Sequence, residues 1–289
     1  SLMGFAGILE LAGGALLLTN AASQLNGTLT IGTNATVQIG NNSAGGLGSR
    51  SDIVNNGTVI TNTNNGHLVL GNKISGTGNF IQTRNTVYLT ADNTYSGTTT
   101  VGLQSVNAGV SLRIGNDTYT GSLGTGDVIL QSTTLGSTDL RWHLIADTIV
   151  ANNITLNPNT DGTNARNATL LRQGLGNITL TGNLTIGSTT GAPNTQVAIL
   201  QSESGGILFI DSTLINGDAS HRLNIVNNGT VVFGGSASNT YNGVLSGNNV
   251  WVFQNSGVTT LAGVNTFNTG STYIDKGTVV LTGGSAIQD

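Results

Sequence analysis

The segment IVNNGTVI at residues 53–60 returns almost unchanged as IVNNGTVV at residues 225–232. The first residues of the two copies differ by 225 − 53 = 172 positions, and NTY at 93–95 is matched at the same offset by NTF at 265–267. Two different short segments that repeat at the same spacing indicate a duplicated module. Such repeats predict an elongated stack in which each unit contacts its neighbours, instead of a single globular core.

The composition is that of a folded protein with very few charges. Of 289 residues, 37% are hydrophobic and only 8% are charged, whereas an ordinary domain carries about 25% charged residues. Disorder is disfavoured because a disordered chain has low hydrophobicity. The net charge of −4 leaves no basic stripe, so we expect no nucleic acid as a partner.

The sequence also bears on export and on the membrane. Cysteine is absent, which suits a chain that crosses an oxidising compartment unfolded. No basic segment of a signal peptide is visible at the start of the sequence given. The apolar stretch 5–18 contains Glu10 and several glycines and is too short to cross a bilayer, so we expect no membrane insertion of this segment.

Short runs of aliphatic and β-branched residues, each closed by Gly or Asn-Gly, predict strands along most of the chain, for example at 28–31, 67–70 and 184–186. A transmembrane barrel would need aromatic girdles, which 4% aromatic content does not supply. A sandwich of hairpins is favoured by Asn-Gly, which suits type I′ turns, but the chain shows no domain break.

A parallel β-solenoid explains more of the pattern. Equivalent side chains would stack at about 4.8 Å, with aliphatic residues inside, Thr and Ser outside and Asn at the corners. Stacked like charges would repel at that spacing, which accounts for their scarcity. At roughly 20 to 25 residues a rung we expect about a dozen rungs, in a rod roughly 60 Å long.

One stretch resembles a known repeat. GTGNFIQTRNTVYLTADNTYSGTTTV (76–101) resembles the passenger-associated repeat of bacterial autotransporters, which ends in Asn-Thr-Tyr-x-Gly-x-Thr-x-Val. Residues 247–274 resemble it again, with one extra residue before Gly270, and NTYNG at 239–243 is a partial third copy. The Lys-Thr-Gly turn of the family is replaced here by Gln82-Thr83-Arg84, and residues 138–149 match no copy.

The resemblance implies a right-handed parallel β-helix that occupies residues 1–289 as one continuous all-β domain, with its best internal copies at 38–112 and 225–282. It implies a location that is secreted or on the cell surface, outside the outer membrane of a Gram-negative-type bacterium. The repeat is a scaffold and does not specify an activity.

No motif predicts catalysis, a cofactor or a metal site. His67, His143 and His221 lie far apart in the sequence, without a neighbour at metal-ligand spacing. Asp218, Ser220 and His221 are close together in the sequence, but adjacent residues of a strand point to opposite faces, which disfavours a catalytic triad. We therefore predict a protein without catalytic, cofactor-binding or metal-binding residues.

The densest polar cluster is a candidate surface-binding site made of Asp139, Arg141, Trp142 and His143. An aromatic ring beside charges can bind a sugar, although an exposed loop or an insertion in a rung is the simpler interpretation.

Three functions remain open. The leading one is a non-enzymatic, structural or adhesive rod at the cell surface, whose partners are glycans or proteins of a host or neighbouring cell. The second is a subunit of a self-assembling fibre that stacks end to end, because the first and last strands lack evident caps. The third is a polysaccharide-active β-helix enzyme centred on 139–147. End-to-end assembly would use the apolar residues Ile8, Leu9, Leu11, Val279, Val280 and Leu281.

Overall fold

The computed structural model describes residues 7–20, 25–48, 52–64, 66–103, 109–133, 136–160, 165–187, 197–216, 222–247, 249–266 and 270–282. The chain divides into two compact units, Ser1–Leu140 (unit 1) and Arg141–Asp289 (unit 2), and each is described by itself. Every regular element in the described ranges is a β-strand. These ranges accordingly contain no helix long and apolar enough to span a membrane.

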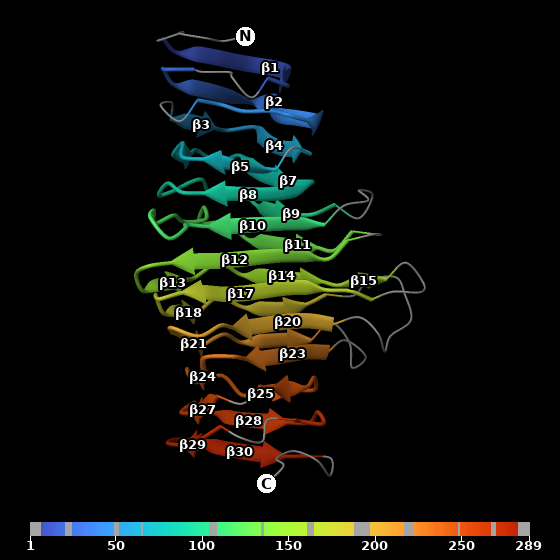
Figure 1. Ribbon diagram of the computed structural model, residues 1–289, viewed down its shortest axis with the longest axis vertical. Coiled ribbons are helices and arrows are strands. Elements are labelled where there is room, and N and C mark those ends of the chain that lie inside the picture. The colour runs from blue at the N-terminus through green and yellow to red at the C-terminus, as the bar shows by residue number, and fades with distance from the viewer. Residues whose placement is uncertain are drawn as a thin grey trace. The chain divides into compact units, whose positions relative to one another are not determined.

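Unit 1 contains two sheets (Figure 1). In the first, the strands are ordered β11-β9-β7-β4-β2-β3-β6, and β1 also pairs with β2. In the second, the order is β10-β8-β5. The strands of the first sheet are β1 (Leu9–Leu18), β2 (Leu29–Ser43), β3 (Ile53–Asn55), β4 (Thr58–Thr63), β6 (Ile74–Ser75), β7 (Asn79–Gln82), β9 (Thr99–Val101) and β11 (Val128–Gln131). Those of the second are β5 (His67–Leu70), β8 (Asn85–Leu89) and β10 (Val110–Ile114).

Strand β12 (Thr138–Leu144) contains the boundary between the units. Unit 2 has four sets of parallel strands, ordered β22-β19-β14, β26-β23-β20-β17, β13-β18-β21-β24-β27-β29 and β25-β28-β30. The first two sets contain β14 (Ile154–Asn157), β19 (Leu184–Ile186), β22 (Leu214–Asn216), β17 (Ala168–Gly174), β20 (Val197–Ser202), β23 (Arg222–Asn227) and β26 (Leu245–Ser246). The third set contains β13 (Thr148–Val150), β18 (Ile178–Leu180), β21 (Ile207–Ile210), β24 (Thr230–Phe233), β27 (Val250–Phe253) and β29 (Thr272–Ile274). The fourth contains β25 (Asn239–Tyr241), β28 (Val258–Leu261) and β30 (Thr278–Leu281), and a short antiparallel pair is formed by β15 (Asn159–Thr160) and β16 (Ala165–Arg166).

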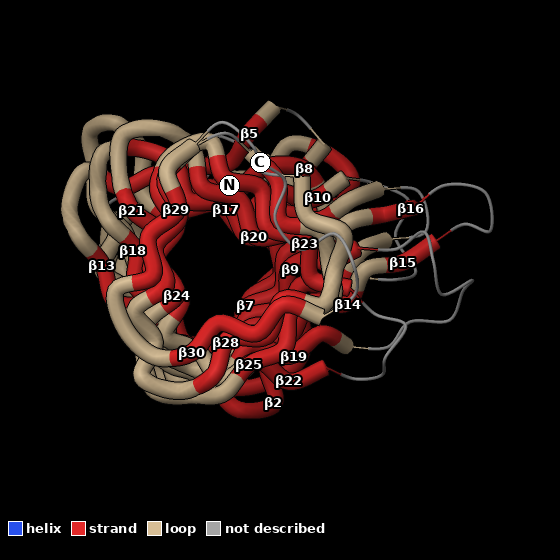
Figure 2. The backbone as a smooth tube through the Cα atoms, turned by 90° about the horizontal axis from the view of Figure 1, so that it is seen from below, coloured by secondary structure: helices blue, strands red, loops and turns tan. Residues whose placement is uncertain are grey.

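The fold is all-β with long parallel sheets, as expected for a β-solenoid. In unit 2, consecutive strands of each parallel set are separated in sequence by strands of other sets, so the chain returns to each set once per circuit. In unit 1, the first sheet also contains strands that follow one another directly, such as β3 and β4. Figure 2 shows the strands of each unit arranged around an interior. The Asn-Gly turn at 56–57 joins β3 to β4, which both pair with β2 in parallel, so it is a corner and not a hairpin.

Asparagine side chains hold the corners together. Asn55, at the end of β3, donates from Nδ2 to the Asn79 carbonyl at 2.9 Å and accepts from the Gly57 N–H at 3.2 Å. Asn227, at the end of β23 and 172 residues later, donates to the Val250 carbonyl at 2.8 Å and accepts from the Gly229 N–H at 3.0 Å. The duplicated sequence therefore builds the same corner once in each unit.

The asparagine of the second repeated segment, Asn93 in one copy and Asn265 in the other, also bonds to a neighbouring strand. The Asn93 side-chain oxygen accepts from the backbone N–H of Ile74 at 2.8 Å, at the start of β6. The Asn265 side-chain oxygen accepts from the N–H of Leu245 at 3.0 Å, at the start of β26. Among the described residues other than glycine, only Asn42 and Asn85 have a positive φ, so most corner asparagines act through their amides and not through a left-handed backbone.

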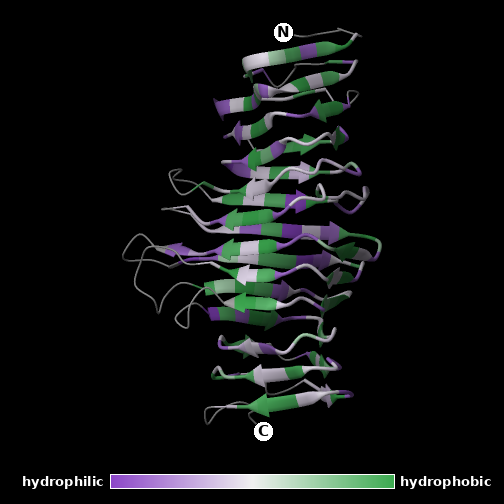
Figure 3. Cartoon of the chain, turned by 180° about the vertical axis from the view of Figure 1, so that it is seen from behind, coloured by the Kyte–Doolittle hydropathy of each residue, from purple (hydrophilic) through white to green (hydrophobic). Residues whose placement is uncertain are grey.

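Along many strands, buried side chains alternate with more exposed ones. Figure 3 colours the strands by hydropathy and shows apolar and polar residues on the same strands. Strand β10, for example, buries Val110, Leu112 and Ile114 and leaves the two residues between them half-buried. In unit 2 the interior also holds aromatic rings. Phe233 stacks on Phe253 with centroids 4.7 Å apart, and Tyr241 meets Phe233 edge-on at 5.0 Å.

The expectation that Thr and Ser fill the outward positions is wrong for two rows. In unit 1, Ile60, Ile81, Thr100 and Ile129 are consecutive register partners on the outward side of the first sheet. In unit 2, a row on the third set runs through Phe209, Val232, Val252 and Tyr273. β-Branched and aromatic residues are favoured on any pleated surface because they pack against cross-strand neighbours.

Candidate functional site

The outward side of the second sheet of unit 1 gathers the polar side chains that have functional chemistry. Strands β5, β8 and β10 lie in parallel register, so His67, Thr86 and Ser111 form one row and Val69, Tyr88 and Arg113 form the next. We call the six residues His67, Thr86, Tyr88, Ser111, Arg113 and Asp139 the polar face.

Tyr88 is the centre of the polar face. Its hydroxyl accepts a hydrogen bond from Arg113 Nη1 at 2.6 Å, and the Arg113 guanidinium carbon lies 5.1 Å from the ring centroid. The His67 imidazole meets the same ring edge-on at 5.4 Å. These contacts restrict the rotamers of a cation, a phenol and an imidazole, so the three groups are already oriented when a ligand arrives.

An acidic group borders the polar face on the side of β10. The Ser111 hydroxyl donates to Asp139 Oδ2 at 2.7 Å, which joins the end of unit 1 to β10. Asp139 is the single carboxylate of the polar face. The Arg113 guanidinium and the hydroxyls of the polar face can donate hydrogen bonds to hydroxyl and anionic groups of a ligand.

The predicted cluster at 139–143 is divided by strand alternation. Arg141 and His143 are half-buried on the outward side of β12, and Arg141 Nη1 donates to Gln173 Oε1 at 3.3 Å. Trp142 points to the other side and is 2% exposed. The prediction that Trp142 binds a ligand at the surface is therefore wrong, and the period of two in a strand explains why.

Of the six residues predicted for end-to-end assembly, five lie on the first and last described strands, and Ile8 directly precedes β1. In unit 1, Ile8 is 71% exposed, while Leu9 and Leu11 are half-buried where β1 pairs with β2. In unit 2, Val280 and Leu281 are exposed and Val279 is half-buried on β30, which pairs with β28. Both strands have one paired edge among the described residues.

Among the described residues, the other predicted features give no second site. Asp218, Ser220 and His221 lie outside the described residues. Within the described part of the chain, no group of three or more His, Cys, Asp or Glu could hold a metal ion.

Burial raises the pKa of Asp211, which follows β21 in unit 2 and lies against Gly234.

Sequence reasoning identified Asp139 but missed the rest of the polar face. The alternation in HLVL at 67–70 indicates that His67 and Val69 share a side of the strand. The register could not be read in the same way, because His67 and Thr86 are 19 residues apart whereas Thr86 and Ser111 are 25 apart.

Comparisons with models of protein families, with curated proteins and with solved structures found no match.

Proposed function

We propose that this chain is a non-enzymatic, extracellular β-solenoid with a structural or adhesive role, resembling an autotransporter passenger. The proposed fold is a right-handed parallel β-helix of roughly a dozen rungs. The proposed location is outside the cell or on the outer membrane of a Gram-negative-type bacterium. The proposed partners are glycans or proteins of neighbouring cells or of a host.

The polar face is the observation that carries the proposal. It presents an oriented cation, a phenol, an imidazole and two hydroxyls on one side of a sheet, and it has one carboxylate. Polar groups that are already fixed suit contact with another surface, because little side-chain entropy is lost on binding.

The repeated corners support the scaffold part of the proposal. Corner asparagines bond to residues 19 to 30 positions away in the sequence, which is the distance that one circuit of the chain spans. Each circuit adds the same backbone and amide bonds, so length is gained without a larger core. A scaffold of this kind suits a protein that displays binding groups at a distance from the cell.

Adhesion of beads coated with the purified chain tests the proposal. We expect coated beads to adhere to at least one surface in a panel of bacterial, animal and plant cells. A double variant, His67→Ala with Arg113→Gln, should reduce adhesion several-fold. A matched double variant elsewhere, Tyr119→Ala with Arg222→Gln, should not. Beads that adhere to none of the cells would overturn the proposal.

Self-assembly into a fibre is the second candidate, and the exposed apolar strands β29 and β30 favour it. Tyr273, Ile274, Val280 and Leu281 are all exposed there. Light scattering over a concentration series tests it, with Val280→Lys and Leu281→Lys as blocking variants. If the scattering mass increases with concentration and each of the two substitutions abolishes the increase, the fibre is supported. A monomer at every concentration would exclude it.

A further inference from the structure

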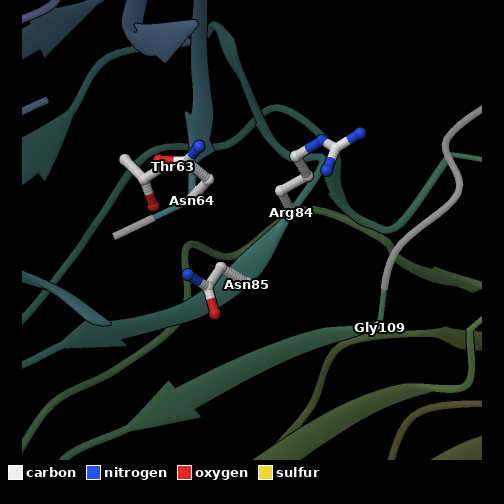
Figure 4. Close-up of a pocket in the computed structure, with 5 residues that line it drawn as sticks. All are labelled: Thr63, Asn64, Arg84, Asn85 and Gly109. Carbon is white, nitrogen blue, oxygen red and sulfur yellow. The ribbon is translucent and has the colours of Figure 1, made fainter. Parts of the chain in front are cut away.

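A small pocket lies beside the polar face of unit 1, at the start of the same strands. It has a volume of about 200 Å³, is open to solvent and is lined by Thr63, Asn64, Arg84, Asn85 and Gly109 (Figure 4). This volume is below the roughly 300 Å³ at which pockets for drug-sized ligands begin, so it suits one small chemical unit of a larger ligand.

The turn that forms the pocket is held rigidly. Thr83 and Arg84 join β7 to β8, and Asn85, the first residue of β8, has a φ of 59°, a left-handed conformation. The buried Gln82 side chain donates from Nε2 to the Asn85 carbonyl at 2.7 Å and to the Ser111 carbonyl at 2.9 Å. This amide therefore fixes the backbone of the pocket relative to the polar face.

Arg84 is the charged residue of the pocket. Its side chain is half-buried, and no hydrogen bond or ion pair of its guanidinium occurs among the described residues. A guanidinium presents donors in a planar fork that matches the two oxygens of a carboxylate.

The other lining groups are neutral hydrogen-bonding groups. Asn64 and Asn85 supply side-chain amides, and Figure 4 shows them with Thr63 on one side of the pocket. Thr63 is 3% exposed, and its buried hydroxyl has no hydrogen-bond partner among the described residues. The two amides beside one cation suit a ligand with several hydroxyls and one negative charge.

The polar face begins next to the pocket along β8. Asn85 and Tyr88 are three residues apart on this strand, or roughly 10 Å. Thr86 and Ser111 lie between them, and the Arg113 guanidinium fixed on Tyr88 lies at the far end. A linear ligand therefore meets a cation at each end of this path and hydroxyls in the middle.

We propose that the pocket binds the carboxylate of a uronic acid unit in an acidic polysaccharide. Arg84 binds the carboxylate, the Asn64 and Asn85 amides bind ring hydroxyls, and further sugar units lie over Thr86 and Ser111 toward Arg113. This inference rests on the proposed adhesive function and names the class of glycan that it recognises.

Calorimetric titration of the whole chain with a uronic acid oligosaccharide tests the inference. The methyl ester of the same oligosaccharide is a control that differs only in charge, and a sulfated oligosaccharide is the third probe. We expect binding of the free acid, weaker binding at higher salt and at least tenfold weaker binding of the ester. Arg84→Gln should weaken binding of the acid at least tenfold, and Arg222→Gln, at an exposed position of unit 2, should leave it unchanged.

The results that would overturn this inference differ from those that would overturn the proposed adhesive function. Equal binding of acid and ester, equal binding by Arg84→Gln, or binding of the sulfated probe alone would overturn the inference. No binding of any probe would also overturn it, while coated beads that still adhere to cells would leave the adhesive function standing. The urea midpoint of Arg84→Gln should match that of the parent chain, because the guanidinium makes no bond to the described residues.

Discussion

At the scale of single residues, the buried charge in unit 2 is Arg172. It is 1% exposed, and its guanidinium donates to Ser202 Oγ at 3.1 Å and to the carbonyls of Gly174 at 2.9 Å and Ser204 at 3.2 Å. Burial lowers the pKa of this guanidinium, and the nearby Glu203 partly offsets that effect. Arg172 therefore satisfies several backbone oxygens at the corner that follows β17.

We expect Arg172→Met to lower the free energy of unfolding by roughly 2–4 kcal/mol, because it leaves buried carbonyl groups without donors. Urea denaturation followed by circular dichroism measures this. Arg222→Met, at the exposed start of β23, is the matched control and should change stability by less than about 0.5 kcal/mol. Equal effects of the two substitutions would contradict the role given to Arg172.

Two buried phenols make stability depend on alkaline pH. Burial raises the pKa of Tyr95 to about 12 and raises that of Tyr241 as well. The folded chain disfavours the ionised phenol, so the contribution is complete below the unfolded pKa of about 10 and is lost as pH rises through the folded value. For Tyr95 we expect a loss of roughly 2–3 kcal/mol between pH 10 and pH 12.

Urea unfolding of the parent chain and of Tyr95→Phe at pH 8, 10 and 11 measures this loss. The variant should show a shallower fall in stability above pH 10 than the parent. Tyr119→Phe, whose side chain is 59% exposed, should follow the parent curve. A slope in Tyr95→Phe identical to that of the parent would show that the Tyr95 phenol stays protonated to the same extent in both states.

At the scale of elements, neighbouring asparagines at one corner differ in what they hold together. Asn227 is buried and bonds to Val250 and Gly229, whereas Asn228 is exposed and reaches Glu203 Oε1 at 3.5 Å. We expect Asn227→Ala to lower the free energy of unfolding by roughly 1–3 kcal/mol, since a half-buried carbonyl and a half-buried N–H lose their partners. Asn228→Ala should have an effect below about 0.5 kcal/mol.

The same experiment in unit 1 uses Asn55→Ala. Because Asn55 makes the equivalent pair of bonds, its loss should be similar to that of Asn227→Ala within about 1 kcal/mol. Denaturation of the single variants and of the parent chain gives the comparison. A large loss for one asparagine and none for the other would show that the repeated words are not equivalent corners.

Corners also show where sequence reasoning succeeds. The repeated segments at 53–60 and 225–232 predicted equivalent structures, and Asn55 and Asn227 form equivalent hydrogen bonds. The glycines next to these asparagines are equivalent as well. A side chain at Gly76 would overlap the Asn55 carbonyl, and a side chain at Gly247 would overlap the Asn227 carbonyl. Such contacts are local to one circuit, so a repeated word is enough to predict them.

Register and outward chemistry were harder to predict. Circuits differ in length, so the alignment of His67, Thr86 and Ser111 depends on how each loop closes and not on a fixed period. Trp142 is different, because strand alternation alone places it opposite Arg141 and His143. Arg84 is visible in the sequence as a departure from the Lys-Thr-Gly turn, but its pocket needs Asn64 and Gly109 from other circuits.

At the scale of the whole molecule, stability depends little on charge. Only 8% of residues are charged, and the net charge is −4. Exposed ion pairs contribute up to about 1 kcal/mol each and are screened by salt, so a chain with few of them has little to lose. We expect the free energy of unfolding to change by less than about 1 kcal/mol between 0.05 and 0.5 M sodium chloride, which urea denaturation can measure. A marked fall with salt would indicate a network of charges that supports the fold.

The most direct test concerns the parallel register that creates the polar face. The chain contains no cysteine, so a double-cysteine variant has no competing thiol. Thr86 and Ser111 are register partners on β8 and β10, within the range that a disulfide can bridge, whereas Thr86 and Arg113 are offset by two residues. On mild oxidation, Thr86→Cys with Ser111→Cys should form an intramolecular disulfide, detected by mass spectrometry of an unreduced digest, and Thr86→Cys with Arg113→Cys should not. The opposite outcome, or no disulfide in either variant, would contradict the stack of parallel strands on which the binding surface depends.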